Sequence, residues 1–388
     1  MDTIVSKDKQ GRYVVRKKTG LTPDGNGNFI PIYDETIGYI ENGAYAELTK
    51  ERKRREETEN VRYLHYGSFA FADSVCYPLR RELSNLGLGI WDGDWNYCVF
   101  LLRAIYGDIK DDSLFRKYEQ SYCSICYPKI SYAKIWLKYS VQSETDIGKN
   151  HPTVLEKSFD LRKKEGHPFL VFAMVKKNTK FTQTWKLNVK ERKRPLRDVV
   201  NVYVIDTITK EPVFFKTYLQ DSITKECYLD FFQEYPLEKG YLLLDDDVSF
   251  ADVEGKISKD VCLIGKKGQE YEVSDKDAMD KKFFLSLMKL KEESMYAFSL
   301  YTSVLSESKE GEDEKNAYGS ELFDFYSSLL RIRLIHRLEE KKKELKMEPS
   351  QVMDVLDGIL VFSLNNGKTW KYGTRSKTEE QVLKILDL

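Results

Sequence analysis

The 388-residue sequence has no long apolar segment and few cysteines. No uninterrupted apolar stretch approaches the ~18 residues that a membrane-spanning helix needs. Residues 1–15 contain no apolar core of signal-peptide length. Six cysteines without a secretory signal favour reduced thiols. We therefore expect a cytoplasmic protein with no part in a membrane.

The sequence also has no excess of charge of either sign. Lys plus Arg equals Asp plus Glu at 62 each, so the formal net charge is zero. A nucleic-acid partner would therefore need a local basic surface. The segment KLNVKERKRPLRD is one candidate, with Lys190, Arg192, Lys193, Arg194 and Arg197. This segment could follow a phosphate backbone, or it could be a solvated loop between strands.

Motifs of several common enzyme classes are missing. The sequence contains no Gly-x-x-x-x-Gly-Lys-Ser/Thr phosphate loop, no Gly-x-Ser-x-Gly elbow and no His-Glu-x-x-His helix. Cys123 and Cys126 have the internal spacing of zinc ligands, but no second Cys or His pair follows at a suitable distance. We interpret these cysteines as packing thiols.

Hydrophobic periodicity divides the chain into four parts. Residues 1–60 predict a strand hairpin or small sheet and then a charged linker. Residues 61–150 have apolar side chains every three or four positions, which is typical of a helical domain and is a candidate for DNA binding. Residues 151–305 read as three strands, a helix, two strands and a helix, the order of an RNase H-like mixed sheet. Residues 306–388 predict a C-terminal helical region. The expected fold class is therefore α+β.

Segments of the chain match one family in the same order. GRYVVRKKTGLTPDGNGNFIPIYDETIGYIENG looks like its N-terminal hairpin, and VNVYVIDTITKEPVFFKTY is similar to a hairpin whose first strand ends in aspartate. The most specific match is YGSELFDFYSSLLRIRLIHRLEEKKKELKMEPSQVMDVLDGILVF near the C-terminus. By these segments, which together span nearly the whole chain, the sequence resembles the insertion-sequence DDE transposases.

The resemblance implies a site for cutting and joining DNA. DDE transposases hold two divalent metals, Mg²⁺ or Mn²⁺, with three carboxylates. YLLLDDDVSF is similar to the segment that carries the second carboxylate, which implies Asp245, and KEESMYAF implies Glu293 (alternatively Glu292) as the third. Both would be catalytic metal ligands. The first acid is missing, because PFLVFAMVKKNTKF has Ala173 and its apolar neighbours where that residue is expected. Without the resemblance, these acids would be an acidic turn and a solvated helix face.

We therefore expect a transposase-like protein that binds double-stranded DNA and whose catalysis is impaired or lost. The resemblance implies a homodimer, Mg²⁺ or Mn²⁺ if the site is active, no small-molecule cofactor, and association with the bacterial nucleoid if DNA is bound. The alternative is a repurposed transposase fold that acts as a protein-interaction scaffold without cleaving DNA, which zero net charge favours. An unrelated enzyme with an acidic pocket at Asp245–Asp247 has little support.

Overall fold

The computed structural model separates into two compact units. The first unit comprises residues 1–63 and 361–373, and the second comprises residues 64–360 and 374–388. The four-part division expected from periodicity stays a prediction. The residues that the structure describes are 3–8, 11–23, 29–41, 44–48, 62–84, 94–107, 111–127, 151–176, 198–220, 224–267, 270–275, 279–300, 313–363 and 369–388.

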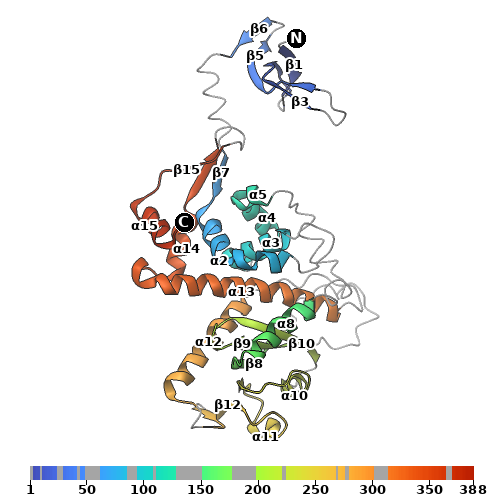
Figure 1. Ribbon diagram of the computed structural model, residues 1–388, viewed down its shortest axis with the longest axis vertical. Coiled ribbons are helices and arrows are strands. Elements are labelled where there is room, and N and C mark those ends of the chain that lie inside the picture. The colour runs from blue at the N-terminus through green and yellow to red at the C-terminus, as the bar shows by residue number, and fades with distance from the viewer. Residues whose placement is uncertain are drawn as a thin grey trace, which may run out of the picture. The chain divides into compact units, whose positions relative to one another are not determined.

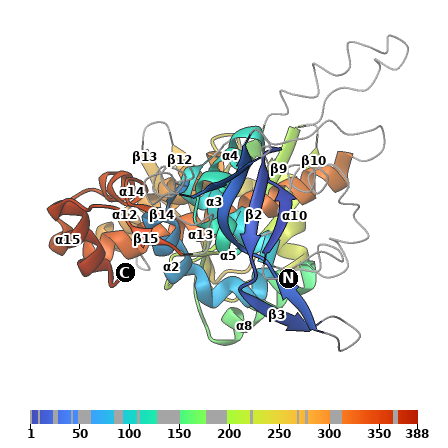
Figure 2. The same ribbon diagram turned by 90° about the horizontal axis from the view of Figure 1, so that it is seen from above.

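Short strands make up the first unit (Figure 2). One sheet has the order β1 (Thr3–Lys7), β2 (Tyr13–Lys17), β5 (Glu35–Glu41), β6 (Ala44–Glu47), and β3 (Gly20–Pro23) pairs with β4 (Phe29–Ile32). The predicted hairpin strands are present as β2, β4 and β5. The sequence did not predict β1 because this strand is exposed along most of its length, so it has no alternating apolar face. A separate three-stranded sheet has the order β15 (Lys371–Tyr372), β14 (Leu360–Ser363), β7 (Arg62–His65).

The second unit begins with the expected helices. These are α2 (Gly67–Ser84), α3 (Asp94–Tyr106), α4 (Asp111–Gln120) and the single turn α5 (Cys123–Cys126). Helices α2 and α3 pack against each other and bury aromatic side chains such as Phe71 and Phe100. Burial of this apolar face stabilises the helices far more than their intrinsic propensity does.

A six-stranded sheet lies at the centre of the second unit. Its order is β10 (Pro212–Gln220), β9 (Asp198–Asp206), β8 (Phe169–Lys176), β11 (Gly240–Leu243), β12 (Val261–Lys267), β13 (Glu270–Val273). The first three strands are antiparallel, β11 and β12 run parallel to β8, and β13 is antiparallel. The sequence predicted all of these strands except β13, three of whose four residues are exposed.

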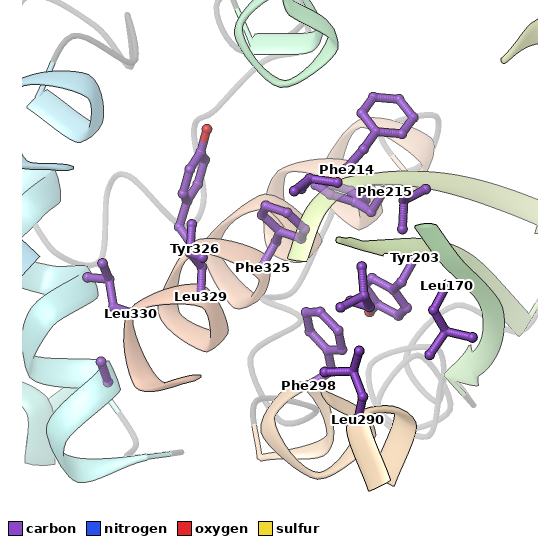
Figure 3. Close-up of a cluster of buried hydrophobic side chains, with 14 of the residues drawn as sticks. Leu170, Tyr203, Phe214, Phe215, Leu290, Phe298, Phe325, Tyr326, Leu329 and Leu330 are labelled. Carbon is purple, nitrogen blue, oxygen red and sulfur yellow. The ribbon is translucent and has the colours of Figure 1, made fainter. Parts of the chain in front are cut away.

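Helices cover both faces of this sheet. Successive strand residues point to opposite faces, so adjacent Phe214 and Phe215 identify the two layers. Phe214 stacks on Phe159 of α8 (His151–Lys164) and contacts α10 (Thr224–Glu234). Phe215 contacts Phe325 of α13 (Asp313–Leu345), on the face where α12 (Lys281–Ser299) also packs (Figure 3). The sequence therefore folds as a mixed α/β structure with a sheet between helical layers.

The long helix α13 connects the parts of the second unit (Figure 1). It contacts α2 and α3 as well as α12 and β10. After it come α14 (Pro349–Asp357) and α15 (Lys377–Leu386), both within the segment 306–388 for which the sequence predicted helices. The remaining element is the one-turn helix α11 (Phe250–Val253). Within the described parts of the chain, no helix is both long and apolar enough to cross a membrane.

Candidate functional site at the carboxyl end of the central strands

The predicted second carboxylate lies where two central strands separate. Strands β8 and β11 are parallel and in register up to the pair Phe172 and Leu243. Beyond that pair, the chain after β11 stays with β12, since the Leu244 amide donates to the Ile264 carbonyl. Asp245 follows directly and is half-buried. The carboxyl ends of parallel strands are a frequent place for ligand sites in α/β sheets.

A tyrosine hydroxyl stands between the two strands at this point. Tyr228 of α10 is fully buried, and its oxygen accepts a hydrogen bond of 2.9 Å from the Ala173 amide. The same hydroxyl donates to the Leu243 carbonyl at 3.0 Å. In a parallel ladder, an amide and a carbonyl placed in this way would bond directly. Tyr228 therefore continues the ladder through its side chain and holds the strand ends apart.

The acids beside Tyr228 affect its ionisation. Burial raises the pKa of Tyr228 well above its usual value, and the charges of Asp245 and Asp247 raise it further. The hydroxyl therefore keeps its proton at neutral pH and can donate it to the Leu243 carbonyl. Its surroundings fit a structural hydrogen-bonding role and do not favour a phenolate.

The other two acids of the LLLDDD segment lie on the surface. Asp246 forms an exposed ion pair with Lys266, with 3.2 Å between the carboxylate oxygen and Nζ. Asp247 is exposed and belongs to the turn that the Val248 amide closes by donating to the Asp245 carbonyl. Asp245 is thus the only half-buried carboxylate of the three, and the turn directs its neighbours to solvent.

The predicted third carboxylate lies elsewhere. Glu293 of α12 is exposed and pairs with Lys289 at 3.4 Å, and its charge affects His336 of α13. Arg333, one turn before His336, forms an ion pair with Glu211 in the turn between β9 and β10. This turn lies beside the amino end of β8, where Phe169 pairs with Asp206. The structure therefore places Glu293 towards the opposite end of the sheet from Asp245 and does not bring the two together. Glu292 is also exposed.

A different glutamate approaches the carboxyl end of β8. Glu321, near the start of α13, is buried and accepts hydrogen bonds from the Asn201 amide at 2.7 Å and from the Tyr203 hydroxyl. Asn201 is paired with Met174 of β8. Glu321 therefore reaches this end of the sheet from the α13 face, whereas Tyr228 reaches it from the α10 face. The sequence analysis did not predict Glu321 or Tyr228 as part of the site. The signal that could have indicated a buried polar partner is Asn201, a lone Asn within the apolar run VVNVYVID.

An ion-pair cluster closes the other end of the sheet. The Asp206 side chain is fully buried and accepts from His167 at 2.7 Å, Arg162 at 2.9 Å and the Ile208 amide at 2.8 Å. Burial alone would raise the pKa of Asp206, but these hydrogen bonds and the Arg162 charge lower it below its usual value. The cluster joins α8 to the β9–β10 turn, so Asp206 acts as a turn residue here.

The described residues do not supply the metal-binding set that the resemblance implies. Where the structure describes side chains, no three His, Cys, Asp or Glu residues converge as a metal ion needs. The position on β8 beside Asp245 carries Ala173, whose amide is already bound to Tyr228. No metal-dependent step can be built on these residues. The basic candidates Lys190, Arg192, Lys193, Arg194 and Arg197 lie outside the described residues.

Comparisons with known proteins do not assign the chain to a family. No model of a known protein family matches the chain, and no curated protein matches it either. Among solved structures, it is similar to a piggyBac transposase synaptic complex with hairpin DNA, at 10% sequence identity and a TM-score of 0.35. That match covers 74% of this chain and 75% of the other. A likeness this distant does not establish a shared fold.

Proposed function

We propose that the chain is a transposase-like DNA-binding protein with an RNase H-like core and an impaired site for phosphoryl transfer. The sheet order supports the core: three antiparallel strands are followed by two strands parallel to β8, with helices on both faces. The sequence predicted the succession of these elements along the chain, namely three strands, a helix and two strands. The ordered resemblance of its segments to DDE transposases supports the DNA-binding part.

One observation carries the claim of impairment. The Tyr228 hydroxyl occupies the point between Ala173 and Leu243 at which β8 and β11 separate. Two-metal phosphoryl transfer needs carboxylates that converge on both ions. Strand β8 (FLVFAMVK) contains neither Asp nor Glu, so Asp245 has no acidic neighbour on that strand.

DNA binding would depend on contacts with phosphates. The candidates are Lys190, Arg192, Lys193, Arg194 and Arg197, which outnumber the single acid among them. A protein that neutralises phosphates with basic side chains releases counterions, so its affinity falls steeply as salt rises. The homodimer and the Mg²⁺ or Mn²⁺ ions that the resemblance implies belong to the same proposal.

The second candidate function is a protein-interaction scaffold with the same fold. The observation in its favour is the zero net charge of the chain, which gives no general attraction to DNA. The two functions differ in one measurable property. Only the DNA-binding protein should show an affinity for duplex DNA that depends strongly on salt.

The test combines plasmid nicking with a DNA-binding titration. Supercoiled plasmid is incubated with Mg²⁺ or Mn²⁺ and with the wild type, Asp245→Asn or the control Asp260→Asn, which changes an exposed residue just before β12. We expect no nicking by any of the three proteins. Nicking that Asp245→Asn abolishes and Asp260→Asn retains would show a working site and refute the claim of impairment.

The titration is repeated at several salt concentrations. We expect that replacing the five basic candidates by Ala lowers the slope of log affinity against log salt by up to about 0.9 for each phosphate that is no longer neutralised. The matched control replaces Lys341, Lys342 and Lys343 of α13, two of which form ion pairs with glutamates, and should leave the slope unchanged. If the wild type does not bind duplex DNA at low salt, the scaffold function replaces the proposed one.

A further inference from the structure

Two cysteines meet between α3 and α5, and a third follows one of them by three residues. The sulfur atoms of Cys98 and Cys123 are 2.8 Å apart, and both side chains are fully buried. Non-bonded heavy atoms prefer separations of about 3.5–4.0 Å, whereas a disulfide bond is about 2.05 Å long. The two thiols are thus closer than packing alone requires. Both are free thiols in this structure.

The third cysteine is accessible to solvent. Cys126 lies three residues after Cys123, on the same turn of helix, and it is exposed. Residues three apart on a helix are neighbours on its surface. A reagent in solution can therefore reach Cys126 first, and Cys123 is adjacent to it on the path to the buried Cys98.

We propose that Cys98 and Cys123 are a redox modification site, and that a low-molecular-weight disulfide such as oxidised glutathione converts them to a disulfide by way of Cys126. In this scheme the Cys126 thiolate attacks one sulfur of the oxidant, forms a mixed disulfide and releases one glutathione thiol. Cys123 then gives its proton to solvent and attacks the Cys126 sulfur, which releases the second glutathione. Finally, Cys98 attacks the Cys123 sulfur and expels Cys126 as a thiol.

The balance is complete without a further reactant. Two protein thiols and one oxidised glutathione give one protein disulfide and two reduced glutathione molecules, so two electrons pass to the oxidant. Burial raises the pKa of Cys123 well above its usual value, and the hydrogen bond with Cys98 raises it further. Burial raises the pKa of Cys126 as well, so Cys126 has its part in the scheme because it is exposed to a dissolved oxidant, whereas Cys123 is buried.

The bond would join two helical segments. Cys98 lies in α3 and Cys123 lies in α5. The segment around α5 is held to β7, because the Tyr122 amide, directly before α5, donates to the His65 carbonyl. A cross-link between these segments restricts the unfolded chain and raises the unfolding temperature. The oxidised protein should therefore melt at a higher temperature than the reduced one.

The experiment maps the disulfides of the full chain. Reduced protein is incubated with oxidised glutathione, quenched with acid, alkylated under denaturing conditions and analysed by intact and peptide mass spectrometry. We expect two of the six thiols to become unreactive and a cross-linked peptide pair containing Cys98 and Cys123 to appear. Failure to find this pair, while other thiols are modified, would overturn the proposal, and this result requires no variant to fold.

Variants test the route. We expect Cys126→Ala to slow formation of the Cys98–Cys123 pair by about tenfold or more, and the control Cys262→Ala, a buried thiol of β12, to leave the rate unchanged. An unchanged rate in Cys126→Ala would refute the role of Cys126. The same oxidation in denaturant should remove the preference for this pair. If the preference persisted there, the folded geometry would not be its cause.

Discussion

The Tyr228 hydroxyl offers the sharpest test of the structure. Tyr228→Phe keeps the ring in the core and removes one oxygen atom, which leaves the Ala173 amide and the Leu243 carbonyl without their partner. A buried polar group that loses its partner costs about 1–3 kcal/mol. With two such groups, we expect the free energy of unfolding to fall by about 2–6 kcal/mol.

Urea denaturation measures the fall in the free energy of unfolding, and hydrogen exchange shows which backbone amides lose protection. The control is Tyr296→Phe, whose side chain is 59% exposed and which should change stability by less than about 0.5 kcal/mol. In Tyr228→Phe, the β8 amides and the Ala173 amide above all should exchange faster than in the wild type. If the variant is as stable as the control and β8 keeps its protection, then the hydroxyl does not bridge the strands and our account of the site is wrong.

Two further substitutions test the ends of the sheet. Asp206→Asn should cost about 1–3 kcal/mol at pH 7. The lowered pKa of Asp206 means that its contribution is present above the unfolded pKa of about 4 and is lost as pH falls through the folded value. The difference in unfolding free energy between wild type and variant should therefore shrink below pH ~4 in urea titrations. A difference that does not depend on pH would contradict the charged interaction. The control is Asp160→Asn, on the surface of α8. Glu321→Leu should lower the free energy of unfolding by about 2–6 kcal/mol because two buried donors, Asn201 and Tyr203, lose their acceptor. A cost no larger than that of the exposed control Glu292→Leu, measured in the same way, would refute that network.

The strands of the central sheet could be predicted because their signal is local. FLVFAMV and VVNVYVI are continuous apolar runs bounded by turn residues, as expected for strands covered on both faces. Helix α8 escaped prediction because, among its residues 155–164, whose burial the structure describes, only Leu155 and Phe159 are buried. Two such positions are too few to establish a helical period.

The contacts of the site could not be predicted in the same way. Glu321 binds Asn201, which is 120 positions earlier in the chain, and Tyr228 binds Ala173, which is 55 positions earlier. No periodicity links residues so far apart, because only the fold brings them together. The resemblance pointed to Asp245 at a strand end, where the structure places it, but it also paired Asp245 with Glu293, which the structure places towards the other end of the sheet.

The division of the chain between its two units has a consequence for biosynthesis. The polypeptide passes from one unit to the other after residues 63, 360 and 373. On the ribosome, nearly the whole second unit emerges before the first receives its last strands, a delay of roughly 15–60 s at ~5–20 residues per second. The second unit in turn waits for α15, which buries Val382, Leu383 and Leu386. Within the first unit, β7 pairs with β14 and cannot complete its sheet until that strand has emerged, whereas β1, β2, β5 and β6 pair with one another and emerge long before it.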